Sequence, residues 1–191
     1  MRRDRMNSGP RGAAPAGSDR SRAEVAATER LRIRRLDAGD VAFLVRLVNE
    51  PSWIRYIGDK DVRSVEDARR YLERGPLAMY GRFGFGLYAV ELRQTREPIG
   101  MCGLIRRDAL PDVDLGFAFL PEYWRSGYAF EAATAVMAHG RAAFGLRRIV
   151  AVLSRDNVRS RRLLERLGFR FERTVRLSPE DEELDLYAAT A

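Results

Sequence analysis

Between residues 84 and 120 the apolar residues recur with a period of two, and this stretch most limits the folds open to the chain. Three segments, GFGLYAVEL (84–92), EPIGMCGLI (97–105) and DVDLGFAFL (112–120), are separated by polar turns. Such alternation is typical of strands, because successive side chains of a strand point to opposite faces of a sheet. The sequence therefore predicts three consecutive strands.

The period then changes to that of a helix. Within residues 128–144 the apolar side chains fall on one stripe, which predicts a helix that packs one face against a core. The run that follows, RRIVAVLS (147–154), is continuously apolar and rich in β-branched residues. A run of this kind is typical of a strand covered on both faces.

Start and stop signals place the remaining elements. We expect a strand over 30–36, a helix over 39–51 capped by Asp40, a loop over 51–62, a helix over 64–76 that starts at Ser64 and stops at Gly75 and Pro76, a helix over 157–168 from Asn157 to Gly168, and strands over 169–177 and 182–190. This order predicts an α/β fold, a mixed and mostly antiparallel sheet of about seven strands with helices on both faces.

Length and composition narrow the class of protein. The 191 residues suffice for one domain with a full core, and no apolar run reaches the ~18 residues of a membrane span. A single cysteine, Cys102, fits a reducing cytoplasm, and a single histidine, His139, gives no metal-ligand spacing. Residues 1–29 lack periodicity and are expected to form a disordered basic tail before a domain over 30–191.

The charge of the chain gives little sign of a nucleic-acid partner. The net charge is +7, of which residues 1–30 contribute +3 from seven arginines and four acidic residues. No tight arginine cluster with interleaved aromatic residues is present, so we expect no specific nucleic-acid binding.

The stretch PEYWRSGYAFEAA (121–133) stands where a strand hands over to a helix. The first N–H groups of a helix have no intrahelical partner and carry partial positive charge. Gly127 would let a ligand approach the backbone, Ala129 keeps the next turn small, Ser126 can cap the helix and Arg125 adds a charge. These features favour a phosphate or pyrophosphate site. The alternative is an ordinary strand-to-helix turn that needs a glycine.

This stretch resembles the phosphate-binding signature of the GNAT superfamily, the acetyl-CoA-dependent N-acetyltransferases. The likeness is to the branch that acetylates N-termini of ribosomal proteins, and it rests on Tyr123, Trp124, Gly127, Tyr128, Ala129, Glu131 and Ala132. A second stretch resembles another signature of the superfamily. The matching residues are Asn157, Ser160, Glu165, Gly168 and Phe169. The general pattern has Gln or Arg where this chain has Trp124. The resemblance spans residues 30–190.

The resemblance implies the acyl-CoA N-acyltransferase fold, with acetyl-CoA as co-substrate. In that fold the strand 112–120 splays away from the strand 147–154, and the pantetheine arm lies between them. The implied cofactor-binding residues are Phe117, Ala118, Phe119, Leu120, Arg125, Ser126, Gly127, Tyr128, Ala129, Asn157 and Ser160. A backbone N–H near Phe119 would polarise the thioester carbonyl. For Asn157 and Ser160 the alternatives are helix capping and a solvated helix surface.

Other residues are candidates for catalysis and for binding of the acceptor. Asp114 is a candidate general base, or it anchors a loop or the charge of the acceptor. Leu164 stands where many members of the superfamily have a tyrosine as general acid. Trp53, Tyr56 and Gly58 would line the acceptor pocket, with a core role as the alternative for Trp53. Cys102 is interpreted as a buried apolar residue and His139 as a packing residue.

We therefore expect an N-acetyltransferase that acts on a primary amine, most readily a protein N-terminal α-amine. The alternatives are acetylation of a small-molecule amine and a catalytically silent acyl-CoA-binding module. We expect no membrane association. The protein is expected to be a monomer or a homodimer, because the strands within 169–190 leave an edge that can pair.

Overall fold

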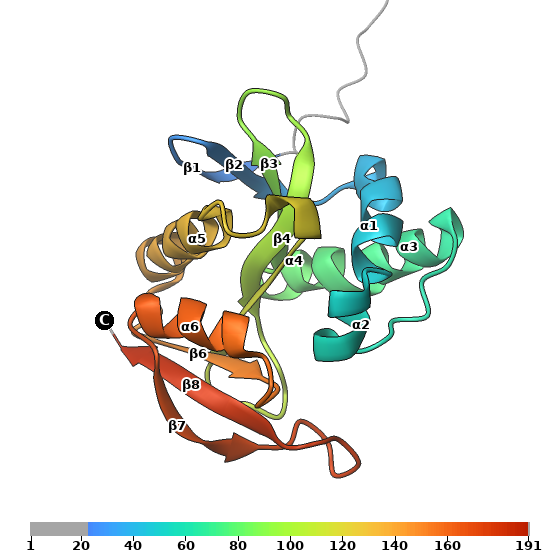
Figure 1. Ribbon diagram of the computed structural model, residues 1–191. Coiled ribbons are helices and arrows are strands. Elements are labelled where there is room, and N and C mark those ends of the chain that lie inside the picture. The colour runs from blue at the N-terminus through green and yellow to red at the C-terminus, as the bar shows by residue number, and fades with distance from the viewer. Residues whose placement is uncertain (1–22, 191) are drawn as a thin grey trace, which may run out of the picture.

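The computed structural model describes residues 23–190, so most of the expected tail lies outside the described residues. One sheet of eight strands runs through the molecule in the order β1-β2-β3-β4-β5-β6-β8-β7 (Figure 1). The strands are β1 Glu24–Ala27, β2 Leu31–Arg35, β3 Leu87–Leu92, β4 Pro98–Ile105, β5 Val113–Phe119, β6 Arg148–Leu153, β7 Arg170–Val175 and β8 Leu184–Thr190. All neighbours are antiparallel except β5 and β6, which confirms a mixed, mostly antiparallel sheet.

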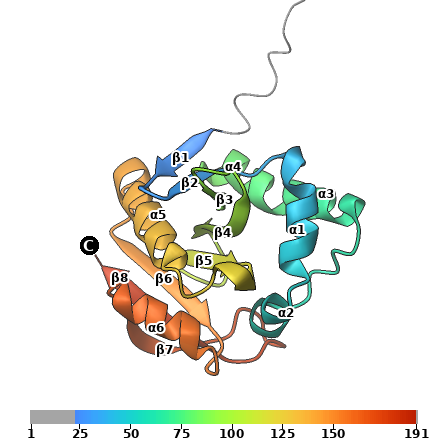
Figure 2. The ribbon, with the colours of Figure 1, turned by 45° about the horizontal axis from the view of Figure 1, so that its top comes forward.

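Helices cover both faces of this sheet (Figure 2). They are α1 Val41–Val48, α2 Pro51–Ile57, α3 Val65–Leu72, α4 Ala78–Phe83, α5 Tyr128–Phe144 and α6 Val158–Arg166. On one face α5 and α6 pack onto the sheet through residues such as Val136 and Leu164. On the other face α1, α2 and α3 bury a second apolar cluster that includes Leu44, Trp53 and Leu72. The two helical layers leave the sheet in the middle, with the end of β5 between them.

Residues 24–27 correct the expected extent of the tail. They form the edge strand β1, which pairs antiparallel with β2. The strand is only four residues long and lacks the apolar alternation of the central strands, so its sequence resembles that of a linker. Its stability comes from pairing with β2, a tertiary contact that local sequence does not reveal.

Two helical stretches differ from the expected boundaries because of prolines. Pro51 is not a stop, since it occupies the first turn of α2, where a missing N–H removes no hydrogen bond. The expected loop over 51–62 therefore begins with a helix. Pro76 lies inside a continuous helix that runs through a π-helical segment, Glu73–Leu77, into α4. The wider π turn accommodates the proline, and the helix ends instead at Gly84, which has φ 80°.

Asp40 does not cap α1 as expected. Asp37 accepts the capping hydrogen bond of the preceding 3₁₀ turn, and Asp40 forms a buried bidentate ion pair with Arg34 at 2.7 and 2.8 Å. Arg34 also donates to Glu91 at 2.5 Å. Burial alone would lower the pKa of Arg34, but Asp40 and Glu91 outweigh it and raise that pKa. This network joins β2, β3 and the start of α1.

The other caps agree with the sequence. Ser64 and Asp67 form a reciprocal capping box at the start of α3. At the end of α6, Gly168 adopts a left-handed conformation with φ 88°, and the next N–H, of Phe169, donates to the carbonyl of Leu164. These bonds are those of a Schellman motif, which ends the helix at the expected glycine.

Candidate functional site

Strands β5 and β6 separate soon after they begin. Their parallel pairing comprises only Val113 with Ile149 and Asp114 with Val150. Beyond Asp114 the two strands diverge, although β5 stays paired with β4 as far as Phe119. The splay expected between residues 112–120 and 147–154 is therefore confirmed, and it leaves part of β5 without a neighbouring strand on its β6 side.

Beyond Asp114, β5 exposes backbone groups on the side that faces β6. The N–H of Leu120 donates to the carbonyl of Ile99 on the β4 side at 3.0 Å. Hydrogen-bonded and non-hydrogen-bonded pairs alternate in an antiparallel ladder, so the backbone groups of Phe119 and Phe117 point away from β4. The indole N–H of Trp124 donates to the carbonyl of Phe119 at 2.8 Å. This leaves the N–H of Phe119 directed into the splay.

Of the four residues at and just after the end of β5 that were expected to bind the cofactor, Leu120 and Ala118 direct their backbone groups toward β4. Leu120 has no exposed surface, and its amide is bonded to Ile99. Ala118 pairs opposite Met101, in the register that directs its backbone toward β4. The backbone groups that remain open belong to Phe117 and Phe119.

The carboxyl of Asp114 lies where the β5–β6 ladder stops. Its side chain is 2% exposed, and Arg107 Nε lies 2.5 Å from Oδ2. The N–H of Val152 donates to Oδ1 at 3.3 Å. The carboxylate thus accepts a hydrogen bond from a backbone N–H of β6 at the point where β5 and β6 diverge. Burial raises the pKa of the Asp114 carboxyl, while Arg107 and the Val152 N–H oppose that shift.

The turn between β5 and α5 presents a row of free amides. Arg125 and Gly127 both have left-handed backbones, with φ 63° and φ 82°. Within residues 23–190, none of the N–H groups of residues 125–130 donates a hydrogen bond to another residue, and the first N–H to do so is that of Glu131, to the carbonyl of Gly127. Six consecutive donors at a helix N-terminus form a site of positive potential that suits an anion.

Ser126 does not cap α5, contrary to one expectation. Gly127 is the N-cap residue, and no side chain caps the helix. The hydroxyl of Ser126 donates instead to the carbonyl of Trp124, at 3.4 Å. The amides at the start of α5 therefore stay available to a ligand.

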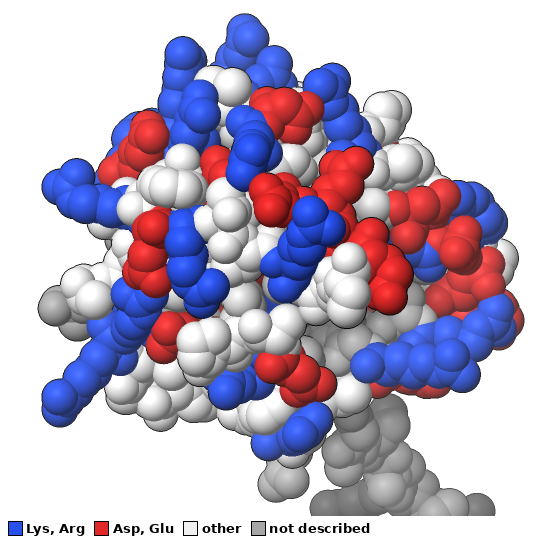
Figure 3. Space-filling model, turned by 90° about the horizontal axis from the view of Figure 1, so that it is seen from below, with Lys and Arg blue, Asp and Glu red and all other residues white. Residues whose placement is uncertain are grey.

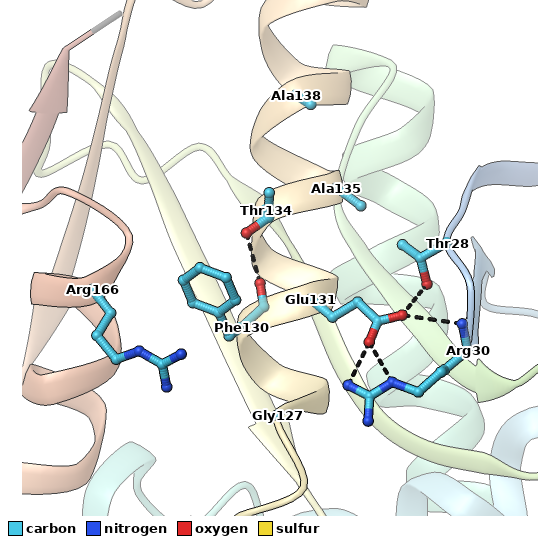
Figure 4. A pocket seen from close by; sticks show the side chains of 9 residues that line it. All are labelled: Thr28, Arg30, Gly127, Phe130, Glu131, Thr134, Ala135, Ala138 and Arg166. Carbon is cyan, nitrogen blue, oxygen red and sulfur yellow. Dashed lines mark hydrogen bonds and ion pairs between the residues drawn. The ribbon is translucent and has the colours of Figure 1, made fainter.

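The hairpin of β1 and β2 holds this turn from outside, through residues that sequence reasoning missed (Figure 4). Arg30 donates to the carbonyl of Ser126 at 2.9 Å and contacts Glu131 Oε2 at 2.6–2.7 Å. Thr28 also donates to Glu131. Burial would raise the pKa of Glu131, but the bonds from Thr28 and Arg30 outweigh it and lower that pKa. Glu131 belongs to the quoted signature, whereas no sequence pattern links Arg30 to residues nearly a hundred positions away.

The loop after β6 supplies the opposite wall of the splay. Asn157 caps α6 by accepting the N–H of Ser160 at 3.1 Å, as the capping alternative predicts. Within the described range, the amide nitrogen of Asn157 and the hydroxyl of Ser160 make no hydrogen bond. The guanidinium of Arg159 lies 4.8 Å from the ring of Trp124 and joins α6 to the turn.

Helix α2 brings the expected acceptor residues near the same loop. Arg55 forms an ion pair with Asp156 at 2.8 Å, and its guanidinium lies over the ring of Tyr56. Trp53 is 4% exposed and belongs to the core, as its alternative predicts. Its indole N–H is buried and has no partner among the described residues. Gly58 ends α2 with φ 97°.

The other residues that the sequence analysis named, Cys102, His139 and Leu164, pack against neighbouring side chains. Cys102 has no exposed surface, and burial raises the pKa of its thiol. His139 packs edge-on against Tyr88 and Phe144, and Leu164 is a buried residue of α6. Over residues 23–190 there is no cluster of three potential metal ligands and no helix with the length and apolarity to cross a membrane. On the face seen in Figure 3, acidic and basic side chains are interspersed.

Comparison with known proteins connects this geometry to a family. Residues 30–170 match an acetyltransferase (GNAT) domain family. YoaA of Bacillus subtilis (strain 168), an uncharacterized N-acetyltransferase, is 31% identical over 153 residues, which cover 78% of this chain and 84% of that protein. A GNAT-family acetyltransferase from Bacillus anthracis superimposes with a TM-score of 0.71 at 25% identity, covering 86% of this chain and 96% of that one.

A third comparison concerns the fold alone. RimL, a ribosomal-protein α-N-acetyltransferase solved in complex with coenzyme A, gives a TM-score of 0.72 at 19% identity, covering 88% of this chain and 98% of that one. With the family match over 30–170 and the splayed strands in place, the chain belongs to the GNAT family of acetyltransferases and is an acetyl-CoA-dependent N-acyltransferase.

Proposed function

We propose that this enzyme acetylates the α-amine at the N-terminus of a polypeptide, through direct attack of the amine on the thioester of acetyl-CoA. The observation that carries the cofactor half of this proposal is the row of six free amides over residues 125–130, next to the splay of β5 and β6. Acetyl-CoA would supply the acetyl group as an activated thioester.

The chain's own backbone would provide the electrostatic part of catalysis. The free amides over residues 125–130 would hold the pyrophosphate, and the open groups of Phe117 would pair with the pantetheine arm. The N–H of Phe119 would donate to the carbonyl oxygen as negative charge develops on it. A preorganised donor of this kind stabilises the transition state by a few kcal/mol, about 3 in well-studied cases.

We propose an anchoring role for Asp114. Both of its carboxylate oxygens are occupied, by Arg107 and by the N–H of Val152, and its side chain is 2% exposed. These contacts support the alternative in which Asp114 holds the loop before β5 and ends the β5–β6 ladder. The amine proton would then leave to water.

The site as proposed uses no side chain of residues 23–190 as a base, and this favours one class of amine. An α-amine has an ordinary pKa of roughly 7.7–8.0 and a lysine side chain roughly 10.4. Deprotonation of the lysine at neutral pH therefore costs about 3.5 kcal/mol more, from about 2.5 pKa units. This difference supports the α-amine as acceptor.

The test is an acceptor panel in which release of the coenzyme thiol is measured. It contains a short peptide with a free N-terminus and no lysine, the same peptide blocked at its N-terminus with one lysine added, and a polyamine. The proposal expects turnover of the first peptide at least about tenfold faster than the others. A preference for the polyamine would identify a small-molecule enzyme, and acetyl-CoA binding without thiol release would identify a silent module.

A further inference from the structure

The peptide unit between Ser126 and Gly127 is free to face either way as far as its own residues are concerned. Gly127 has φ 82°, and glycine adopts positive and negative φ with similar ease. Rotation of this peptide plane by half a turn would reverse the sign of that φ with little movement of the chain on either side. Arg125, with φ 63°, is a non-glycine residue in the left-handed region, a conformation that persists only where neighbouring groups hold it. The local sequence therefore does not determine which way the peptide faces.

The direction of this peptide matters for an anion at the turn. In a trans peptide the C=O and the N–H point in opposite directions. The carbonyl of Ser126 points toward Arg30 of the β1–β2 hairpin, so the N–H of Gly127, one of the free amides over residues 125–130, points away from the hairpin. The reversed peptide would place a carbonyl oxygen among those amides. Its partial negative charge would oppose an anion that the remaining N–H groups attract.

Arg30 holds the Ser126 carbonyl with a guanidinium whose own orientation is fixed by Glu131. Nε and Nη2 of Arg30 contact Glu131 Oε2 at 2.7 and 2.6 Å (Figure 4). Nη1 is then directed to the carbonyl of Ser126, to which it donates at 2.9 Å. The backbone N–H of Arg30 donates to Glu131 Oε1 at 3.1 Å, so the main chain of Arg30 is also tied to the first turn of α5. Because the guanidinium is planar, fixing two of its nitrogens fixes the direction of the third.

Arg30 contributes direction to the turn and little net charge. Its charge is balanced by the carboxylate of Glu131 at 2.6 Å. The guanidinium also lies 4.6 Å from the centre of the Tyr128 ring, which limits its movement on that side. What the turn receives from Arg30 is therefore a hydrogen bond of fixed geometry to one carbonyl.

We propose that Arg30 is a positioning residue for acetyl-CoA: it fixes the Ser126–Gly127 peptide so that the N–H of Gly127 faces the pyrophosphate. Arg30 acts through this peptide and not through contact with the cofactor. The inference rests on the proposed place of the pyrophosphate at residues 125–130. It adds that the β1–β2 hairpin, which lies outside both signatures, sets the affinity of the enzyme for acetyl-CoA.

The experiment measures acetyl-CoA binding by calorimetry on the full chain and on two variants of Arg30. Arg30→Gln is expected to weaken binding about tenfold, the effect of one hydrogen bond to a charged group. Arg30→Lys keeps the positive charge opposite Glu131 but lacks the planar group that reaches two acceptors at fixed angles, so it should weaken binding to a similar extent. In both variants kcat at saturating acetyl-CoA should stay within about twofold of the parent, because Arg30 acts on binding and not on the reacting atoms.

Arg32→Gln is the matched control for stability of the hairpin. Arg32 lies in β2 and pairs with Glu24 at 3.0 Å and with Glu91 at 3.2 Å. Its loss should lower the free energy of unfolding, measured in urea, and leave acetyl-CoA affinity unchanged.

Three results would overturn the inference while the parent still bound and turned over acetyl-CoA. Arg30→Gln could bind like the parent, in which case the peptide needs no support. Arg30→Lys could bind like the parent, which would assign the effect to charge. Arg32→Gln could lose as much affinity as Arg30→Gln, which would assign the effect to stability of the hairpin. Absence of acetyl-CoA binding by the parent would overturn the proposed place of the pyrophosphate as well.

Discussion

Helix α5 begins and ends at left-handed glycines, and this symmetry provides a controlled test of the phosphate turn. Gly127 has φ 82° at the start of the helix and Gly145 has φ 66° at its end. A Cβ built at Gly127 would meet nothing closer than Arg30 Nη2 at 3.4 Å, and one at Gly145 would meet nothing within 4 Å. Alanine at either position is therefore strained by its backbone conformation and by little else.

The two substitutions should cost similar stability and differ in binding. A non-glycine residue in the left-handed region costs roughly 1–2 kcal/mol, so Gly127→Ala and Gly145→Ala should each lower the free energy of unfolding by about that amount. Valine at Gly127 would cost more, because β-branched residues tolerate this region poorly. The methyl group at Gly127 would stand where phosphate oxygens approach the backbone, and it should reduce acetyl-CoA affinity by about tenfold, or about 1.4 kcal/mol.

Urea unfolding and calorimetric titration with acetyl-CoA on the parent and both variants measure the two effects separately. Gly145→Ala is expected to bind acetyl-CoA like the parent. If Gly127→Ala binds as tightly as Gly145→Ala, the glycine serves the turn alone, and the reasoning that places pyrophosphate against it is refuted.

Three further predictions concern the Asp114 carboxyl, the N-terminal segment and pH. Asp114→Asn keeps an acceptor for the β6 amide, so kcat should fall by less than about tenfold; a loss of about a hundredfold or more, with acetyl-CoA affinity unchanged, would identify a general base. Removal of residues 1–22 should leave the melting temperature within a few degrees of the parent, because it spares β1, whereas removal of residues 1–29 should lower it further by deleting β1. Glu131 has a lowered pKa, so its stabilisation is present above its ordinary value of 4.5 and is lost as the pH falls through the lowered value. The stability difference between the parent and Glu131→Gln, measured by urea unfolding, should shrink over that range, and a difference that grows there would contradict this.

Sequence patterns predicted the parts of the fold that local chemistry determines. The capping box at Ser64 and the Schellman motif at Gly168 each need only residues a few positions apart, and both formed as expected. The parallel contact of β5 with β6 was expected only through the family resemblance. Pro51 was misassigned because a proline can stop one helix or start another, and local sequence does not distinguish the two.

The sequence predicted the backbone turn of the site. It did not predict most of the side-chain contacts around that turn. The turn around Gly127 is a local feature with a recognisable signature. The contacts of Arg30 with Ser126, and of Arg107 with Asp114, join distant or irregular segments, so they depend on the packed structure. The expectation for Ser126 failed because a hydroxyl can satisfy itself on the nearest carbonyl.

The short contact between β5 and β6 divides the sheet into two antiparallel halves. One half consists of β1 to β5 and the other of β6, β8 and β7, and only two residue pairs join them in the sheet. A half joined in this way can open without global unfolding, so amide hydrogen exchange in β6 and β8 should proceed at a lower free energy than in β3 and β4. A thioester bound between β5 and β6 would contact both halves and bind only the closed form. Acetyl-CoA should therefore raise the free energy of opening of β6 and β8 by RT ln(1 + [L]/Kd), where [L] is the concentration of free acetyl-CoA, and the cofactor would act as a cooperative link between two folding units.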